Sequence, residues 1–256
     1  MWLAGKNKAP QIPLSLHVNK TTRCGPDLRL RHVLQQIQIS RTDLQLGTNL
    51  QALIDSQNTP ALPNAEIVLV LSNRKAAYGL TRALSVNPPI PTRCLALQPY
   101  LKKNPDRTRK DYDVEVARIV VNAKPDVVVL AGWMHILSER FLEIVEGRVT
   151  LNDLETPAMP IPVINLHPAL PGAFDGANAI KRAYEAFMKG EIEQSGCMVH
   201  RVVKDVDRGE PIIVREVTIE KGESLEALEE RLHKVEHEII VQATKKILEG
   251  CGVRYS

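Results

Sequence analysis

The sequence predicts an α/β fold, with a mainly parallel, twisted sheet, helices on both faces, and an antiparallel hairpin followed by a long C-terminal helix. Three observations support this prediction. From Gly47 onward, short apolar runs alternate with segments of helical periodicity. Residues 127–130 (VVVL) form a continuous apolar run, which is typical of a strand buried on both faces. The last periodic segment, about 224–248, keeps apolar residues at helical spacing. Strands that alternate with helices indicate parallel pairing with right-handed crossovers.

Each element follows from its own pattern of apolar and turn-forming residues. Helices are predicted from about Thr48, over 76–84, over 114–122, near 138–145, from about Ala177, and over about 224–248. Strands are predicted at 67–71, 94–97, 127–130, 163–166, 198–203 and 212–219, the last two paired through a turn-rich segment. A chain of 256 residues has room for one sizeable domain of this Rossmann-like kind and little more.

Composition excludes several classes of protein. Hydrophobic residues make up 44% of the chain and charged residues 25%, as in ordinary globular proteins. No apolar stretch approaches the roughly 20 residues of a membrane-spanning helix, so no membrane association is predicted. The four cysteines are far apart and form no CxxC pair, which argues against a zinc ribbon or a disulfide framework. This usage fits a reducing compartment, and we predict a cytoplasmic protein without a metal.

The basic residues are concentrated at the start of the chain. Residues 1–41 contain seven Lys and Arg against the single acid Asp27, so this segment is strongly positive although the whole chain carries only +3. No basic face is indicated on the folded body, and no nucleic-acid partner is predicted. Residues 1–41 show no sustained helical or strand periodicity. We interpret 1–46 as an atypical basic extension, either disordered or misassigned; an organellar targeting segment is the alternative.

Asn165 and His167 are two residues apart at the end of an apolar strand, so their side chains leave the same face. Open α/β sheets keep their ligand crevice at the carboxyl ends of the strands, and Pro168 ends this strand. Asp207, in a later turn-rich segment, supplies a carboxylate that can hold the imidazole charged. An amide donor and a cationic imidazole suit acyl transfer to an amine. We therefore predict Asn165, His167 and Asp207 as the catalytic residues.

Gly47, Thr48 and Asn49 open a helix, whose N-terminus offers unpaired N–H groups to an anion. The alternative for this triplet is an ordinary N-cap. Neither GxGxxG nor GxxxxGK[ST] occurs in the chain, which disfavours a dinucleotide-dependent redox enzyme and an NTPase. His200 could join His167 and Asp207 as a metal ligand, but this spacing matches no recognised zinc pattern.

Five segments together resemble one family, the phosphoribosylglycinamide formyltransferases, with the short monofunctional fungal type most similar. The helix opening at 47–55 resembles the first helix of that family, and 72–80 its second strand–helix junction. Residues 125–137 resemble the folate-site strand and loop. The segment 164–172, which contains Asn165, Leu166, His167 and Pro168, is similar to the catalytic strand end, and 196–211 resembles the catalytic hairpin. The resemblance covers roughly 47–249 in the order of the family, and it implies a formyltransferase domain at 47–256.

The resemblance implies the substrates and their binding residues. The formyl donor would be 10-formyltetrahydrofolate, the acceptor the amine of 5′-phosphoribosylglycinamide, and the pathway de novo purine biosynthesis. The implied ribonucleotide-binding residues are Gly47, Thr48, Asn49 and Glu236. The implied folate-binding residues are Arg109, Met134, His135, Ile136, Leu137, Asn165, Val203, Lys204, Asp205, Val206 and Asp207. Many relatives have arginine at the position of His135, so recognition through the backbone is expected there.

The expected mechanism follows from the charges. The amine attacks the formyl carbon, and Asn165 and a His167 kept protonated by Asp207 donate hydrogen bonds to the oxygen that becomes negative. Asp207 also organises water for proton transfer.

The main departure from the family precedes Gly47. Relatives have an apolar first strand there, whereas 39–46 lacks the β-branched run of a buried parallel strand. Either a degraded strand fills that position, or the sheet lacks a central strand. An inactive folate- or nucleotide-binding relative is therefore one alternative. A second is formyltetrahydrofolate deformylase, although its regulatory domain would not fit in 1–46. Methionyl-tRNA formyltransferase is disfavoured, because its basic carboxyl-terminal domain has no counterpart after the last helix.

Overall fold

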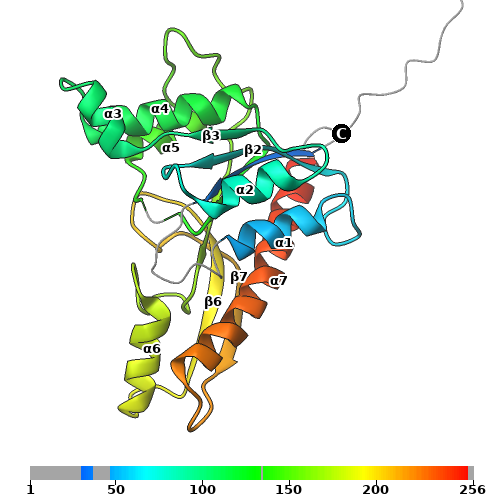
Figure 1. Cartoon of the computed structure of the whole chain (residues 1–256), viewed down its shortest axis with the longest axis vertical. Coiled ribbons are helices and arrows are strands. Elements are labelled where there is room, and N and C mark those ends of the chain that lie inside the picture. Colours follow the sequence, from blue (N-terminus) through cyan, green and yellow to red (C-terminus); the bar gives the residue numbers. More distant parts are fainter. Residues whose placement is uncertain (1–29, 37–46, 134, 253–256) are drawn as a thin grey trace, which may run out of the picture.

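The computed structural model of the chain describes residues 30–36, 47–133 and 135–252 (Figure 1). In this part of the chain, seven strands form one sheet in the order β3-β2-β1-β4-β5-β6-β7. The strands are β1 (Leu30–Gln36), β2 (Ala65–Ser72), β3 (Thr92–Cys94), β4 (Val127–Ala131), β5 (Val163–His167), β6 (Gln194–Arg201) and β7 (Pro211–Thr218). Strands β3, β2, β1, β4 and β5 are parallel, whereas β6 and β7 pair antiparallel. The predicted architecture is confirmed.

Two helical layers cover the sheet. The helices are α1 (Thr48–Ser56), α2 (Tyr78–Ser85), α3 (Leu97–Lys103), α4 (Arg109–Asn122), α5 (Glu139–Val145), α6 (Ala179–Met188) and α7 (Leu225–Gly252). On one face, α1, α2 and α7 pack against apolar side chains that include Val127 and Val129 of β4. On the other face, α4 and α5 pack against Val128 and Leu130. The alternation explains why the VVVL run is apolar throughout, because both faces of β4 are buried.

Strand β1 differs from the sequence-based expectation. No strand periodicity was found in 1–41, yet Leu30–Gln36 occupies the centre of the sheet, parallel to β2 on one side and to β4 on the other. The physical reason lies in the backbone. Two parallel neighbours each present unpaired N–H and C=O groups, and an intervening segment that pairs with both satisfies them whatever its side-chain pattern. The central position is therefore filled, and residues 39–46, where a degraded strand was considered, lie outside the described residues.

Strand β6 begins at Gln194 rather than at Met198, and two further boundaries also differ from the prediction. The segment 94–97 was expected to be a strand, but β3 ends at Cys94 and helix α3 begins at Leu97, with Pro99 tolerated in its first turn. Helix α4 begins at Arg109 rather than near Val114, because a capping box fixes its start. The Thr108 side chain accepts a hydrogen bond from Asp111 N, and Asp111 Oδ2 accepts one from Thr108 N at 2.8 Å.

Helix α7 is the longest element of the described chain. It packs against α1, β6 and β7 and so joins the parallel half of the sheet to the antiparallel hairpin (Figure 1). Leu228, Leu232 and Ile239 are fully buried along it. None of the helices in the described ranges is both long enough and apolar enough to cross a bilayer.

Candidate active site

Strand β5 and the loop after β6 bring the predicted catalytic residues together. Asn165 and His167 lie on the same face of β5, and Asp207 reaches both from the 202–210 loop. Asn165 Nδ2 donates to Asp207 Oδ1 at 3.3 Å, and His167 Nδ1 lies 3.4 Å from Asp207 Oδ2. The imidazole of His167 is buried, and its Nε2 has no hydrogen-bond partner within the described residues. One carboxylate therefore links an amide donor to an imidazole whose outer nitrogen is unused.

The backbone of the 202–210 loop determines where the carboxylate sits. Asp207 has a φ of 55°, a left-handed conformation that is uncommon for residues other than glycine and frequent at functional sites. Its Oδ2 accepts a hydrogen bond from Gly176 N at 2.9 Å. At Gly209 the loop returns so close to Arg201 that a Cβ atom would collide with the Arg201 carbonyl. The loop therefore requires glycine at 209 in order to present Asp207 to β5.

The electrostatic environment changes the expected protonation of His167. Burial lowers the pKa of His167 below its ordinary value, and the attraction of Asp207, which raises it, is too weak to reverse this. This direction is opposite to the expectation that Asp207 keeps His167 protonated. The reason is that the ring is 3% exposed, and desolvation of its cation outweighs a single carboxylate at 3.4 Å. The lowered pKa favours the uncharged form of the ring.

Asp207 is ionised. Burial by itself would raise the pKa of Asp207, but the hydrogen bonds from His200 and from the N–H of Gly176 act against it, and the pKa is lowered. The carboxylate is thus available to stabilise a positive charge on either imidazole beside it.

A pocket of about 310 Å³ opens over these residues. Ten of the predicted residues are among those that line it: His135, Ile136, Leu137, Asn165, His167, Val203, Lys204, Asp205, Val206 and Asp207. Arg109 is absent from the lining, but it donates to the carbonyl of Ile136 at 2.8 Å and so supports the 132–138 loop. Lys204 is paired with Glu139 at 3.1 Å. Met134 lies outside the described residues.

The side chain of His135 anchors its loop. His135 Nε2 lies 2.7 Å from Asp113 Oδ1, and the other oxygen of Asp113 accepts the N–H of Ser138 at 2.8 Å. The ring also makes edge contacts with Tyr112 and Trp133. This arrangement explains how histidine can stand at this position, because its side chain, which is 7% exposed, supports the loop through Asp113.

The predicted ribonucleotide residues form a second group outside the 310 Å³ pocket. Gly47 has a φ of 86° and is the N-cap residue of α1. Glycine has no side chain that could cap the helix, so the first-turn N–H groups of Thr48 and Asn49 receive no hydrogen bond from a capping side chain. Asn49 Nδ2 donates to Glu236 Oε2 at 3.2 Å, which joins α1 to α7. Burial raises the pKa of Glu236, against the opposing effects of His233 and of the Asn49 hydrogen bond. A helix N-terminus and a buried carboxyl are therefore adjacent.

Sequence reasoning missed three residues of this site. Asp113 lies on the buried face of α4, one turn before Val116 and Ala117, and an acid at such a position requires a partner. Gly209 lies in the turn-rich segment before β7, and nothing in the sequence indicated its close approach to Arg201. His200 was considered only as a metal ligand, whereas its Nε2 lies 3.2 Å from Asn165 Nδ2 and 3.4 Å from Asp207 Oδ1. Within the described chain, no group of three or more side chains is arranged to hold a metal ion.

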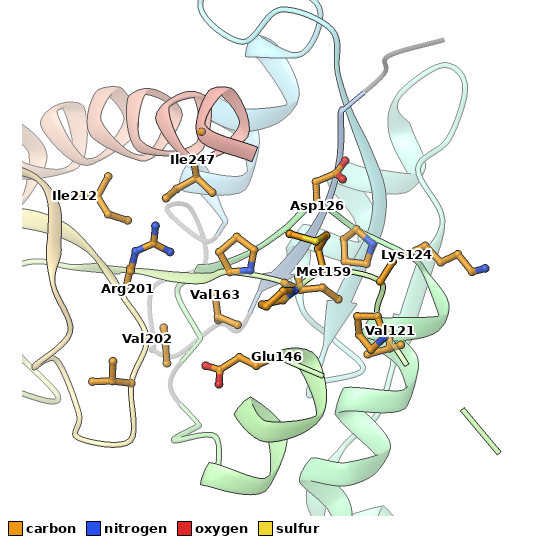
Figure 2. A pocket seen from close by; sticks show the side chains of 18 of the residues that line it. Val121, Lys124, Asp126, Glu146, Met159, Val163, Arg201, Val202, Ile212 and Ile247 are labelled. Carbon is orange, nitrogen blue, oxygen red and sulfur yellow. The ribbon is translucent and has the colours of Figure 1, made fainter. Parts of the chain in front are cut away.

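A larger hollow of about 750 Å³ lies at the opposite end of the strands (Figure 2). Asp126 and Val163, at the amino ends of β4 and β5, line it together with Met159 and Ile247. Among its described lining residues, Val203 alone belongs to the predicted site. The predicted catalytic side chains line the smaller pocket. The larger hollow is therefore not the candidate active site.

Comparisons with known proteins agree with this geometry. The sequence model of a family described as formyl transferase matches residues 44–244. A phosphoribosylglycinamide formyltransferase of Schizosaccharomyces pombe is 49% identical over 204 residues, which cover 79% of this chain and 92% of that protein. That of Saccharomyces cerevisiae is 42% identical, covering 79% and 93%. The crystal structure of phosphoribosylglycinamide formyltransferase from Bacillus halodurans superposes with a TM-score of 0.67 at 28% identity, covering 85% of this chain and 95% of that one.

Proposed function

This chain belongs to the formyl transferase family, and on that premise we propose that it transfers a formyl group from 10-formyltetrahydrofolate to the amine of 5′-phosphoribosylglycinamide, in de novo purine biosynthesis. One observation carries the proposal: Asn165, His167 and Asp207 meet at the carboxyl end of β5, beside a pocket. The similarity to the S. pombe and S. cerevisiae enzymes extends over nearly their whole length, which supports the same pair of substrates.

The pocket suits a reduced pterin. Exposed apolar side chains at its rim, Ile136, Val203 and Val206, can contact the ring faces. The buried Nε2 of His167 is without a partner among the described residues, as expected of a nitrogen that serves a ligand. Backbone groups of 135–137 and 203–207 are available for the pterin edge. The bound co-substrate supplies a formyl carbon that is open to attack by an amine.

We assign the other substrate to the group formed by α1 and α7. The N–H groups that follow Gly47 would bind the phosphate, because a helix N-terminus attracts an anion. Glu236, whose pKa is raised by burial, would contact the glycinamide end together with Asn49. These roles for Gly47, Thr48, Asn49 and Glu236 rest on the family resemblance and on the geometry of the helix end.

In the reaction, an N–C bond forms between the amine and the formyl carbon, and the bond from that carbon to N10 of the folate breaks. Asn165 donates a hydrogen bond to the oxygen that gains negative charge, and such a donor is typically worth about 3–4 kcal/mol. The uncharged Nε2 of His167 accepts the proton that the amine must lose, and Asp207 stabilises the resulting imidazolium across 3.4 Å. His167 then returns this proton to N10. His167 thus acts as a proton carrier rather than as a permanent cation.

We propose that the formyltransferase domain comprises 47–256 together with β1, and that the residues before β1 are an extension. The family match from residue 44 and the pairing of β1 with β2 and β4 support this division. The filled central position also disfavours an inactive relative. We further propose a cytoplasmic location, which the widely spaced cysteines support.

A direct assay separates the transferase from its alternatives. The purified full chain receives 10-formyltetrahydrofolate with or without the ribonucleotide, and release of tetrahydrofolate is followed. We expect release only with the ribonucleotide, and a loss of about 100- to 1000-fold in Asn165→Ala. Met159→Ala, in the hollow at the other end of the strands, serves as the control and should retain activity. Release into water alone would identify a deformylase. Binding of both substrates without transfer would overturn the proposal.

A further inference from the structure

Asp113 holds two points of the pocket loop, although it does not itself line the pocket. It lies on helix α4, and its side chain is 1% exposed. Its Oδ1 lies 2.7 Å from His135 Nε2, and its Oδ2 accepts the N–H of Ser138 at 2.8 Å. One buried carboxyl group therefore joins a side chain at the beginning of the segment 135–138 to a backbone group at its end.

Arg109 holds the same segment between these two points. It lies one helical turn before Asp113 on α4, so the two side chains leave the same face of the helix. Its Nη2 donates to the carbonyl oxygen of Ile136 at 2.8 Å. Arg109 is exposed, whereas the side chains of Asp113 and His135 are 1% and 7% exposed. Water can therefore replace the bond of Arg109, but it cannot reach those of Asp113.

The ring of His135 is also fixed by aromatic neighbours. Its centroid lies 5.4 Å from that of Tyr112 and 6.1 Å from that of Trp133, both in edge contacts. Tyr112 is fully buried, and its hydroxyl donates to the carbonyl oxygen of Leu95 at 2.7 Å. Rotation of the ring away from Asp113 would displace these buried side chains, so the ring transmits the position of α4 to the loop.

The segment 135–138 forms part of the pocket wall. Its first three residues line the pocket, and the Ile136 side chain is 55% exposed. A wall that is ordered before the ligand arrives loses less conformational freedom on binding, which strengthens the affinity. We propose that Asp113 is a positioning residue that orders this wall through His135 and Ser138, and thereby sets the affinity for the formyl donor. This inference rests on the proposed function for the identity of the ligand.

The first test measures binding and requires no formyl transfer. The full chain is titrated with tetrahydrofolate in a calorimeter, in the absence of the ribonucleotide. We expect His135→Leu to weaken binding by about 5- to 50-fold, because the partner of a buried carboxyl group is lost. His135→Gln, whose amide can donate to Asp113, should bind within about 3-fold of the wild type. Unchanged binding in His135→Leu, or equal losses in both variants, would overturn the proposal.

This measurement separates the inference from the proposed function. A chain that binds tetrahydrofolate but transfers no formyl group would refute the transferase, while the comparison of the two His135 variants would still decide the role of Asp113. Both variants leave Asp113 in place, so the result does not depend on the folding of a variant at that buried position.

The second test is a double-mutant cycle in steady-state kinetics. Asp113→Ala should raise the KM for 10-formyltetrahydrofolate by about 5- to 50-fold. The KM for the ribonucleotide and kcat should change less than about 3-fold, because the bonds of Asp113 reach the loop and not the catalytic residues. In the Asp113→Ala background, His135→Leu should add less than about 2-fold, since the two residues act as one unit. Effects that multiply, or a fall in kcat without a change in KM, would refute the assignment.

Amide hydrogen exchange tests the support of the loop directly. In the wild type the N–H of Ser138 is protected by its bond to Asp113, and in Asp113→Ala it should exchange at least about 10-fold faster. Equal exchange rates at Ser138 in the two proteins would contradict the proposal, because the loop would then be ordered without the carboxyl group.

Val116→Ala is the matched control for a general loss of stability. Val116 lies one turn after Asp113 on α4 and is fully buried in the same core. This variant should lower the melting temperature through a lost core contact and leave tetrahydrofolate binding and the exchange of Ser138 unchanged. If Val116→Ala weakened binding as much as His135→Leu, the stability of the helix would explain both results and the proposal would fall.

Discussion

Replacing Asp207 with asparagine removes one negative charge from between two imidazoles and leaves the shape of the side chain unchanged. The carboxylate lies 3.4 Å from His167 Nδ1 and 3.4 Å from His200 Nε2. An asparagine oxygen can still accept the N–H of Gly176, and asparagine tolerates the left-handed φ of 55° at this position. We therefore expect a folded protein whose melting temperature is close to that of the wild type.

The expected loss of rate follows from the charge pair. An opposite charge at this distance moves the pKa of an imidazole by about 1–3 units, and each unit corresponds to about 1.36 kcal/mol. The barrier to forming an imidazolium at His167 should therefore rise by about 1.4–4 kcal/mol, which lowers kcat by about 10- to 1000-fold. The KM for the ribonucleotide should change less than about 2-fold, because Asn49 and Glu236 bond to each other and not to Asp207.

The assay is tetrahydrofolate release at saturating 10-formyltetrahydrofolate, with the ribonucleotide varied. Wild type and Asp207→Asn are compared in kcat and in KM, and thermal unfolding verifies that both are folded. A kcat within about 3-fold of the wild type would refute the role of the carboxylate. A raised KM with an unchanged kcat would instead make Asp207 a binding residue.

Three other outcomes are expected. Burial lowers the pKa of His167 below its ordinary 6.5, and the proton-accepting form of the ring is the neutral one. Activity should therefore be full at neutral pH and fall only as the pH drops through that lowered pKa. An acid limb centred above 6.5 in the kcat profile would contradict this. Gly209→Ala should lower the melting temperature by several degrees and reduce kcat, because the new Cβ collides with backbone. Gly250→Ala, which lies in helix α7 and whose Cβ meets nothing within 4 Å, should lower neither the melting temperature nor kcat. Glu236→Ala should raise the KM for the ribonucleotide by about 10- to 100-fold through the loss of a hydrogen bond to a charged group, with the KM for the folate unchanged. The control is Glu230→Ala, at an exposed position on the same helix that is paired with Lys234. Equal effects of the two substitutions would refute the assignment.

Most of the elements could be predicted because local patterns determine them. The apolar run of β4 and the helical periodicity of α7 are visible in the sequence, since each burial pattern repeats over several residues. The predicted start of α4 was five residues too late, although the residues of its capping box, Thr108 and Asp111, are visible in the sequence. Strand β1 was missed for a different reason. Its sequence, LRHVLQQ, shows no sustained strand periodicity, and its pairing with β2 and β4 is made by backbone groups.

The proximity of Asn165, His167 and Asp207 was predictable because two of them share one strand face. Spacing alone places Asn165 and His167 together, and a polar loop supplied Asp207. The buried pair of Asp113 and His135 could not be predicted with the same ease, because its partners come from a helix and a loop that meet only in the folded chain.

The sequence by itself determined the order of the elements, the residue types of the site and their positions at strand and helix ends. These depend on contacts between residues near one another in the chain. The tertiary structure alone decided that the pKa of His167 is lowered and which groups surround His200, because both depend on how deeply each ring is buried and which atoms lie beside it. Desolvation and hydrogen-bond counting act on the assembled site, so no spacing in the sequence reveals them.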